Sequence, residues 1–264
     1  MDVDLAQIED VDFVWRGEPL HEVVGGNDRY DWIIASHVIE HLPDPVGFFN
    51  GCREVLKPEG IVSLVVPDKR YCFDYFRPLS TSGDILDAFE QRRIRPTPGS
   101  VFDSLANCVS LEGQTSWSAN DREGDFRNVY TFETAQNAWE RAKRGHEDAH
   151  IWRFTPASFR LILQDLRSLG LLRFEQIHEF DTAGNEFFVT LGQRASAAAP
   201  TERTALLHQI DRELAEALRI DTTAREQPAG SAQTLALSPK EERMIVFKRR
   251  VVEGIRSPFK SSRP

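Results

Sequence analysis

Two almost continuous apolar runs on either side of an amphipathic segment constrain the fold of this chain more than any other feature. Residues 32–36 (WIIAS) and 61–66 (IVSLVV) lack regular polar alternation, which is typical of strands buried on both faces of a parallel sheet. Apolar residues recur at a helical spacing over residues 44–56, where Asp44 can cap the helix and Pro45 occupies its first turn. Strand, helix and strand joined by short turns predict a right-handed parallel crossover.

Four further segments have clear periodicity. Residues 11–15 (VDFVW) are β-branched and aromatic and predict a strand that precedes the crossover. Residues 155–170 open with Thr-Pro, carry apolar residues at helical spacing and end in glycine, which predicts a helix. Residues 173–180 and 185–191 alternate around an Asp-Thr-Ala-Gly turn and predict an antiparallel hairpin.

Residues 77–150 interrupt this pattern and are interpreted as a largely helical insertion, with helices expected at 84–93 and 131–143. The insertion is rich in aromatic residues, which could stack on apolar sugar faces or form a small core of their own. These residues are Trp117, Phe126, Tyr130, Phe132 and Trp139.

Residues 192–264 are interpreted as a C-terminal appendage to the main domain. A linker at 192–200 is followed by a helix at 201–220, whose narrow apolar stripe fits either docking on the main domain or a short coiled-coil seam. Residues 221–264 predict a mobile basic tail. Within it, residues 240–264 hold eight Lys or Arg against three Glu, a net +5.

Net charge and cysteine content indicate which binding partners and which cellular compartment to expect. The net charge of -9 and the pI near 5.4 argue against a nucleic-acid binder and favour a small-molecule or glycan partner. The basic tail fits either a peripheral contact with an anionic surface or a solvated end. Three unpaired cysteines, no secretory signal and no membrane-spanning run favour the cytoplasm.

The stretch at residues 31–77 resembles the second half of a class I S-adenosylmethionine-dependent methyltransferase. It has a buried strand, the Glu40-His41 pair, a helix, a VLKPEG turn at 55–60 and another strand. The hairpin at 173–191 resembles the final antiparallel pair of that fold. The resemblance implies a doubly wound, Rossmann-like α/β sheet over residues 1–191, and S-adenosylmethionine as cofactor.

The same resemblance implies an incomplete N-terminus. Class I enzymes open with a strand, a glycine-rich turn and a helix that meet the cofactor, and residues 11–15 already match the third strand. Either the start lies too far downstream or the chain is a truncated remnant, and both readings predict poor cofactor binding by the chain as written. The Gly25-Gly26 pair precedes the next strand and is no substitute.

By resemblance, four residues belong to the cofactor site. Val14 and Trp15 end the first predicted strand and would border the adenine. Ser36 and His37 end the next strand and would lie near the methionine moiety, because ligands of open α/β sheets bind at the carboxyl ends of the strands.

Four other residues are candidates for orienting the methyl acceptor or taking its proton. Glu40, His41 and Asp68 follow the strand ends, and His150 lies where the insertion rejoins the sheet. Alternatives remain for each. Glu40 and His41 can cap a turn, Asp68 can cap a helix or pair with the basic residues after it, and His150 can be a structural histidine. No residue is assigned to a metal.

A competing motif occurs at residues 146–150 (HEDAH), which match the H-E-x-x-H signature of zinc hydrolases. That chemistry needs both histidines on one helix face, and little room for a helix remains before Thr155. The preferred function is methylation of a hydroxyl on a sugar or small metabolite. A non-catalytic methyltransferase-like subunit and a zinc hydrolase are the alternatives.

Overall fold

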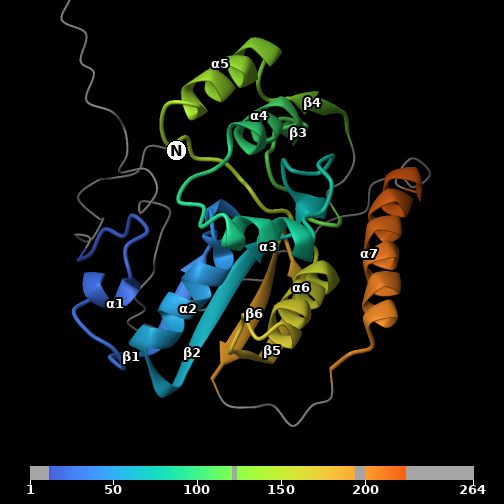
Figure 1. Ribbon diagram of the computed structural model, residues 1–264. Coiled ribbons are helices and arrows are strands. Elements are labelled where there is room, and N and C mark those ends of the chain that lie inside the picture. Colours follow the sequence, from blue (N-terminus) through green and yellow to red (C-terminus); the bar gives the residue numbers. More distant parts are fainter. Residues whose placement is uncertain (1–11, 121–123, 194–199, 224–264) are drawn as a thin grey trace, which may run out of the picture.

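The computed structural model describes residues 12–120, 124–193 and 200–223 and shows an α/β protein (Figure 1). A four-stranded mixed sheet has the order β1-β2-β6-β5, and β3 and β4 form a separate two-stranded sheet. In the main sheet β1 and β2 are parallel, whereas β6 is antiparallel to β2 and to β5. The strands are β1 Tyr30–Ser36, β2 Leu56–Pro67, β3 Val109–Leu111, β4 Phe126–Asn128, β5 Glu175–Ala183 and β6 Glu186–Gly192.

Helices fill the connections between the strands. The predicted crossover and hairpin are both confirmed, with α2 between the parallel strands and a tight turn between β5 and β6. The helices are α1 Leu20–Val23, η2 Ile39–His41, α2 Pro45–Val55, η3 Lys69–Tyr71, α3 Ser82–Glu90, α4 Pro98–Ala106, α5 Phe132–Ala142, α6 Pro156–Ser168 and α7 Arg203–Thr223.

Local capping explains where the two crossover helices begin. Asp44 accepts a hydrogen bond from the backbone N–H of Gly47, and Pro45 follows as the first helical residue of α2. At α6, Thr155 and Ser158 form a reciprocal capping box. Both start sites were predicted from sequence because caps depend on neighbouring residues.

The Asp44 cap provides the first testable prediction. Replacing Asp44 with alanine leaves the N–H of Gly47 without its acceptor and is expected to lower the free energy of unfolding by about 1 kcal/mol. Asp31→Ala is a matched control, because this carboxylate is exposed and its ion pair within the described residues is with Lys57, itself an exposed side chain. Its expected change is below about 0.5 kcal/mol. Urea unfolding followed by circular dichroism measures both values, and equal losses would contradict the assignment.

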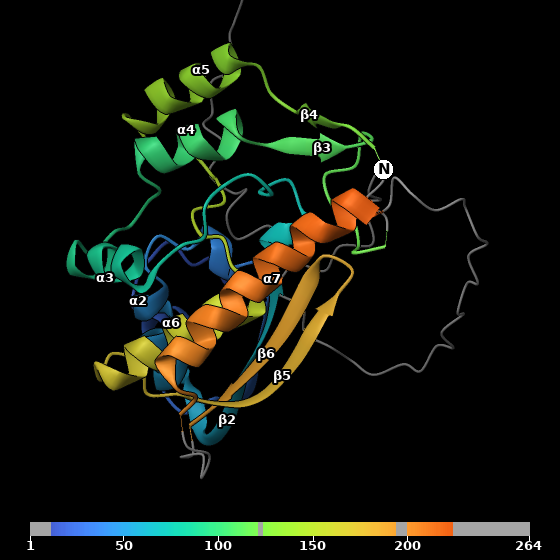
Figure 2. The ribbon, with the colours of Figure 1, turned by 90° about the vertical axis from the view of Figure 1, so that its right-hand side faces the viewer.

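The main core lies on one face of the sheet. Val62, Leu64 and Val66 of β2 alternate inward with Phe187 and Leu191 of β6, and all are buried against the helices. Helices α2, α3 and α6 lie on the same side of these strands (Figure 2).

The expectation that the first apolar run is buried on both faces is wrong, because Trp32 of β1 is 69% exposed. In the described part of the chain, β1 pairs only with β2 and is an edge strand. An apolar sequence alone does not reveal how many layers cover a strand.

Strand β2 begins earlier than expected. The predicted turn at residues 57–60 lies inside the strand as an irregularity, since Tyr30 pairs with Leu56 and Trp32 already pairs with Ile61. The extra residues bulge out of the ladder between those two pairs, so the helix stop was predicted correctly and the start of pairing was not.

The strand predicted at residues 11–15 is wrong for the residues that the structure describes. Asp12 to Trp15 lie in no strand. Trp15 instead packs against Phe48 of α2, with ring centroids 6.0 Å apart, and its Nε1 donates to the carbonyl of Glu18. β-Branched and aromatic composition makes a strand only where a neighbouring strand offers hydrogen bonds.

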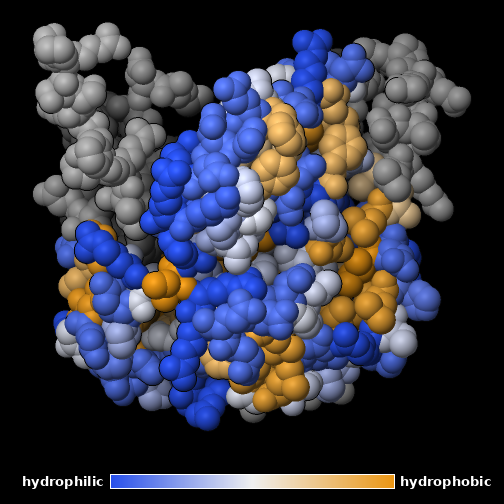
Figure 3. Space-filling model, turned by 45° about the horizontal axis from the view of Figure 1, so that its top comes forward, coloured by the Kyte–Doolittle hydropathy of each residue, from blue (hydrophilic) through white to orange (hydrophobic). Residues whose placement is uncertain are grey.

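In its described residues, 77–120 and 124–150, the insertion carries the helices α3, α4 and α5 and the small sheet. Helices at α3 and α5 were predicted, and α4 was missed. Two of the five aromatics, Trp117 and Phe126, pack with Tyr71, Val109 and Leu111 in a second core. Figure 3 shows separate apolar patches among hydrophilic residues at this end of the molecule. Exposed aromatics of the insertion include Tyr130 (43%) and Phe132 (69%).

Helix α7 docks on the main domain. It packs along α6, and the carboxylate of Glu213 accepts a hydrogen bond from the backbone N–H of Ala157 in the first turn of α6. The helix predicted at 201–220 continues through residues 221–223, which the prediction had placed in the tail. The rest of that tail, 224–264, and most of the linker at 192–200 lie outside the described residues. In the described part, no helix has both the length and the apolarity to cross a membrane.

Candidate functional site

The carboxyl ends of β1 and β2 lie side by side. Ser36 pairs with Val65 in parallel register, and the N–H of His37 donates to the carbonyl of Val65 (3.0 Å). His37 has a φ of +54°, and this left-handed turn leads the chain from β1 into η2. The inference that these two strands are parallel neighbours with a shared edge is confirmed.

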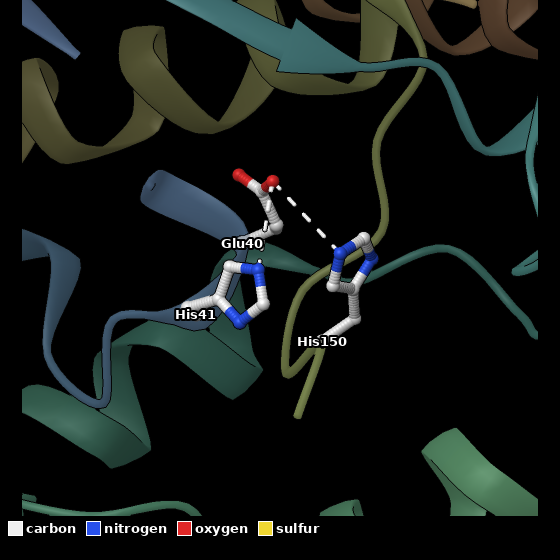
Figure 4. Close-up of side chains that lie close together, drawn as sticks. All are labelled: Glu40, His41 and His150. Atoms are coloured by element: carbon white, nitrogen blue, oxygen red, sulfur yellow. Dashed lines mark ion pairs between the residues drawn. The ribbon is translucent and has the colours of Figure 1, made fainter. Parts of the chain in front are cut away.

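Three side chains converge beyond this edge, and we call them the Glu–His cluster: Glu40, His41 and His150. The Nε2 atoms of both histidines lie 3.9 Å from Oε1 of Glu40, and the imidazole rings meet edge to face with centroids 4.6 Å apart (Figure 4). Glu40 is 1% exposed, yet neither of its carboxylate oxygens accepts a hydrogen bond. A buried carboxylate in that state is costly unless a cation or donor compensates for it.

Backbone hydrogen bonds hold the two halves of the cluster together. Glu40 and His41 belong to η2, while His150 comes from an extended segment more than a hundred residues later. The N–H groups of Ile151 and Trp152 donate to the carbonyl of Glu40 (2.7 and 3.1 Å). These bonds fix the returning chain against η2, so the position of His150 does not depend on side-chain contacts alone.

Each histidine of the cluster is oriented by a carboxylate on its other nitrogen. Nδ1 of His41 lies 2.8 Å from Asp148, and Nδ1 of His150 lies 2.6 Å from Asp74. Asp74 also pairs with the buried guanidinium of Arg77. Such partners fix the tautomer and ring orientation of a histidine.

Both of these carboxylates are held in the ionised state. Burial opposes ionisation of Asp74, but its contacts with His150 and Arg77 outweigh burial and lower its pKa. For Asp148, burial is likewise outweighed, chiefly by the hydrogen bond and charge of His41, and the pKa is again lowered. Sequence analysis missed both residues. Asp148 lay within the HEDAH motif, whereas nothing in the aromatic stretch around Asp74 distinguishes it.

A third histidine approaches the cluster from β1. Nδ1 of His37 lies 3.5 Å from Oε1 of Glu40, and its Nε2 contacts Glu186 at the start of β6. His37 is about one-third exposed, so it lies between the buried carboxylate and solvent. It therefore connects the predicted methionine end of the site with the predicted acceptor end.

Asp68 is not part of the cluster. It is completely buried, its carboxylate binds the guanidinium of Arg70 through both oxygens and accepts from Thr182, and it caps η3. Of the roles left open for this residue, these contacts support the cap and the ion pair.

The two predicted adenine neighbours are less well placed. Val14 is 45% exposed, and Trp15 is engaged with Phe48 and Glu18. Ser36 and His37 do lie at the carboxyl edge of β1, as expected. The structure therefore places Ser36 and His37 at the carboxyl edge of β1, with His37 next to Glu40.

The helical zinc-hydrolase arrangement is absent from residues 146–150, all of which the structure describes. These residues form no helix, so His146 and His150 are not stacked one turn apart. Glu147 instead makes a bidentate pair with Arg141.

Comparison with known proteins identifies the family. Residues 3–166 match the sequence profile of a family described as "Methyltransferase domain", which is more than half of the chain. The chain belongs to this family. Its predicted class and α/β fold are thereby confirmed.

Curated relatives of this methyltransferase-family chain share a name. A "Ubiquinone biosynthesis O-methyltransferase" of Dinoroseobacter shibae is 22% identical over 130 residues, which is 41% of this chain and 49% of the relative. Proteins of the same name match in Cereibacter sphaeroides, with 31% identity over 48 residues (18% and 19%), and in Pasteurella multocida, with 30% over 60 residues (23% and 25%). The matched stretches span half or less of these relatives.

Proposed function

We propose that this protein transfers a methyl group from S-adenosylmethionine to a hydroxyl oxygen of a small molecule. The observation that carries the proposal is the Glu–His cluster, which lies beyond the parallel β1–β2 edge in a methyltransferase-family chain. Open α/β sheets bind their ligands at that edge. The relatives' names, which specify O-methylation in ubiquinone biosynthesis, support an oxygen acceptor.

The charge of this edge suits the methionine end of the cofactor. Ser36 and His37 lie at the end of β1, and the carboxylates of Glu40 and Glu186 contact His37 from two sides. The sulfonium and ammonium groups of the cofactor are cationic, so an acidic edge attracts them. In the described residues, no glycine-rich loop lies between a strand and a helix ahead of β1, and we assign no residue to the adenosine half.

The reaction needs alignment more than covalent chemistry. The acceptor oxygen attacks the methyl carbon, the carbon–sulfur bond breaks, and sulfur leaves as a neutral thioether. The hydroxyl proton passes to a basic group and then to solvent. The protein orients the two reactants and excludes water. The Glu–His cluster is proposed to hold the acceptor hydroxyl, while Asp68 supports the site through the η3 turn.

Calorimetry and a methyl-transfer assay test this proposal. Titration with S-adenosylmethionine is measured for the 264-residue chain and for a version extended by any coding sequence upstream. Transfer of labelled methyl is then assayed on a phenolic and a sugar acceptor. We expect one bound cofactor per chain and label on a hydroxyl oxygen for at least one form. Failure of both forms to bind the cofactor would contradict the proposal and favour a non-catalytic methyltransferase-like subunit.

A further inference from the structure

We infer that Glu40, His41 and His150 form a binding site for one divalent transition-metal ion, with Zn²⁺ as the best match. The three residues offer one carboxylate oxygen and two imidazole nitrogens that all lie within 4.8 Å of one another. Two histidines and one carboxylate with further positions open are a recurrent ligand set for catalytic zinc and for other divalent transition ions.

The spacing leaves room for an ion between the ligand atoms. Oε1 of Glu40 lies 3.9 Å from Nε2 of His41 and from Nε2 of His150, which is too far for a hydrogen bond. Ligand atoms around a tetrahedral zinc ion are separated by about 3.4 Å, given bonds of about 2.0–2.1 Å. Closing the site therefore requires each imidazole nitrogen to approach Oε1 of Glu40 by about 0.5 Å, and no pair of ligand atoms, all within 4.8 Å of one another, to approach by more than about 1.4 Å.

The histidines are already turned for metal binding. Asp148 and Asp74 lie within hydrogen-bonding distance of Nδ1 of His41 and of His150, respectively, and in both residues the Nε2 atom points toward Glu40 (Figure 4). Histidines that bind metals almost always donate their other ring N–H to a carboxylate, a carbonyl or water. The Asp148–His41 and Asp74–His150 pairs both have this arrangement, and both direct Nε2 of the histidine toward Oε1 of Glu40.

Burial argues against a purely structural network. Neither oxygen of Glu40 accepts a hydrogen bond, although the residue is 1% exposed. The nearest imidazole nitrogens, of His37, His41 and His150, lie 3.5, 3.9 and 3.9 Å from its Oε1. A buried carboxylate without a hydrogen bond is costly, and a divalent cation would bind its free oxygen.

The ligand types select the class of metal. Two imidazoles favour zinc and its neighbours in the first transition row, whereas magnesium and calcium prefer oxygen ligands. With three protein ligands, a fourth position stays open for water or an acceptor oxygen. The inference that the site binds a metal depends only on the contacts of Glu40, His41 and His150. That the bound metal lowers the pKa of the acceptor hydroxyl depends in addition on the proposed function.

Metal titration of the full chain tests the inference. Protein stripped with a chelator is titrated with Zn²⁺ by calorimetry, and bound metal is counted by mass spectrometry after dialysis. We expect one zinc per chain, much weaker Mg²⁺ binding, and visible Co²⁺ bands of a tetrahedral or five-coordinate site. Glu40→Gln and His150→Ala are each expected to weaken zinc binding by at least about 100-fold. Asp148→Asn is expected to weaken it by about 10–100-fold.

His146→Ala is the matched control, because His146 neighbours the cluster in sequence and is not one of its ligands. Thermal unfolding of every variant without metal verifies that it is folded. The proposed site would be overturned if the wild type bound no zinc. It would also be overturned if neither the Glu40→Gln nor the His150→Ala variant bound zinc more weakly than the wild type, or if the His146→Ala variant lost zinc binding. Because these titrations omit S-adenosylmethionine, the metal site and the proposed methyl transfer can fail separately.

Discussion

Replacing Asp68 with alanine is expected to lower the free energy of unfolding by about 3–5 kcal/mol. The substitution leaves the guanidinium of Arg70 buried without its carboxylate partner and removes the cap of η3. It also removes the acceptor of the Thr182 hydroxyl, a hydrogen bond that joins the end of β5 to the residue after β2. Breaking a buried ion pair by removing one of its members is far more costly than losing an exposed ion pair. Urea unfolding measures the change.

A double-variant cycle separates the ion pair from its surroundings. Asp68→Ala combined with Arg70→Ala is expected to cost less than the sum of the two single changes, by about 0.5–3 kcal/mol, because each single change already breaks the same ion pair. Additive losses would show that the two side chains act independently. A single loss below about 1 kcal/mol would contradict a structural role for the Asp68–Arg70 pair and return Asp68 to the catalytic candidates.

The second large effect is expected in the core. Phe187→Ala should lower the free energy of unfolding by about 3–5 kcal/mol, because Phe187 is completely buried in β6 and a cavity would remain after its removal. Its ring packs edge to face on Phe159 of α6, with centroids 5.8 Å apart, so the cavity would open between sheet and helix.

Phe180→Ala is the control for this core prediction. Phe180 lies on the neighbouring strand β5 and is 67% exposed, so its truncation is expected to change the free energy of unfolding by less than about 0.5 kcal/mol. Both variants are compared by thermal and urea unfolding. Similar losses for the two would mean that the exposed face of the hairpin is covered in solution.

The Glu–His cluster combines residues from two sequence motifs that were considered separately. The Glu40-His41 pair and the HEDAH motif were treated as separate alternatives, one for methyl transfer and one for zinc hydrolysis. In the structure, the cluster contains both residues of the Glu40-His41 pair. From the HEDAH motif it contains only His150, and Asp148 of that motif orients His41. His146 and Glu147, which the hydrolase reading required, lie outside the ligand set.

Local patterns predicted the elements that depend on near neighbours. The strand–helix–strand crossover followed from two apolar runs, the Asp44 cap and Pro45, and the final hairpin followed from its turn. Periodicity and caps act over a few residues, so one sequence contains all the information they need. Glu40, His41 and His150 were also singled out from sequence, the first two as the Glu-His pair of the family resemblance and His150 because it lies where the insertion rejoins the sheet.

Only the tertiary structure decided how those residues combine. Asp74 and His150 are 76 residues apart, and no spacing rule reveals that one orients the other. Residues 12–15 have strand-like composition without a strand partner, and Trp32 is exposed despite its apolar neighbours. Contacts between distant segments, and the number of layers over a strand, depend on how the whole chain packs. The sequence therefore predicted Glu40, His41 and His150 as candidate residues, whereas their arrangement and their carboxylate partners depend on the tertiary structure.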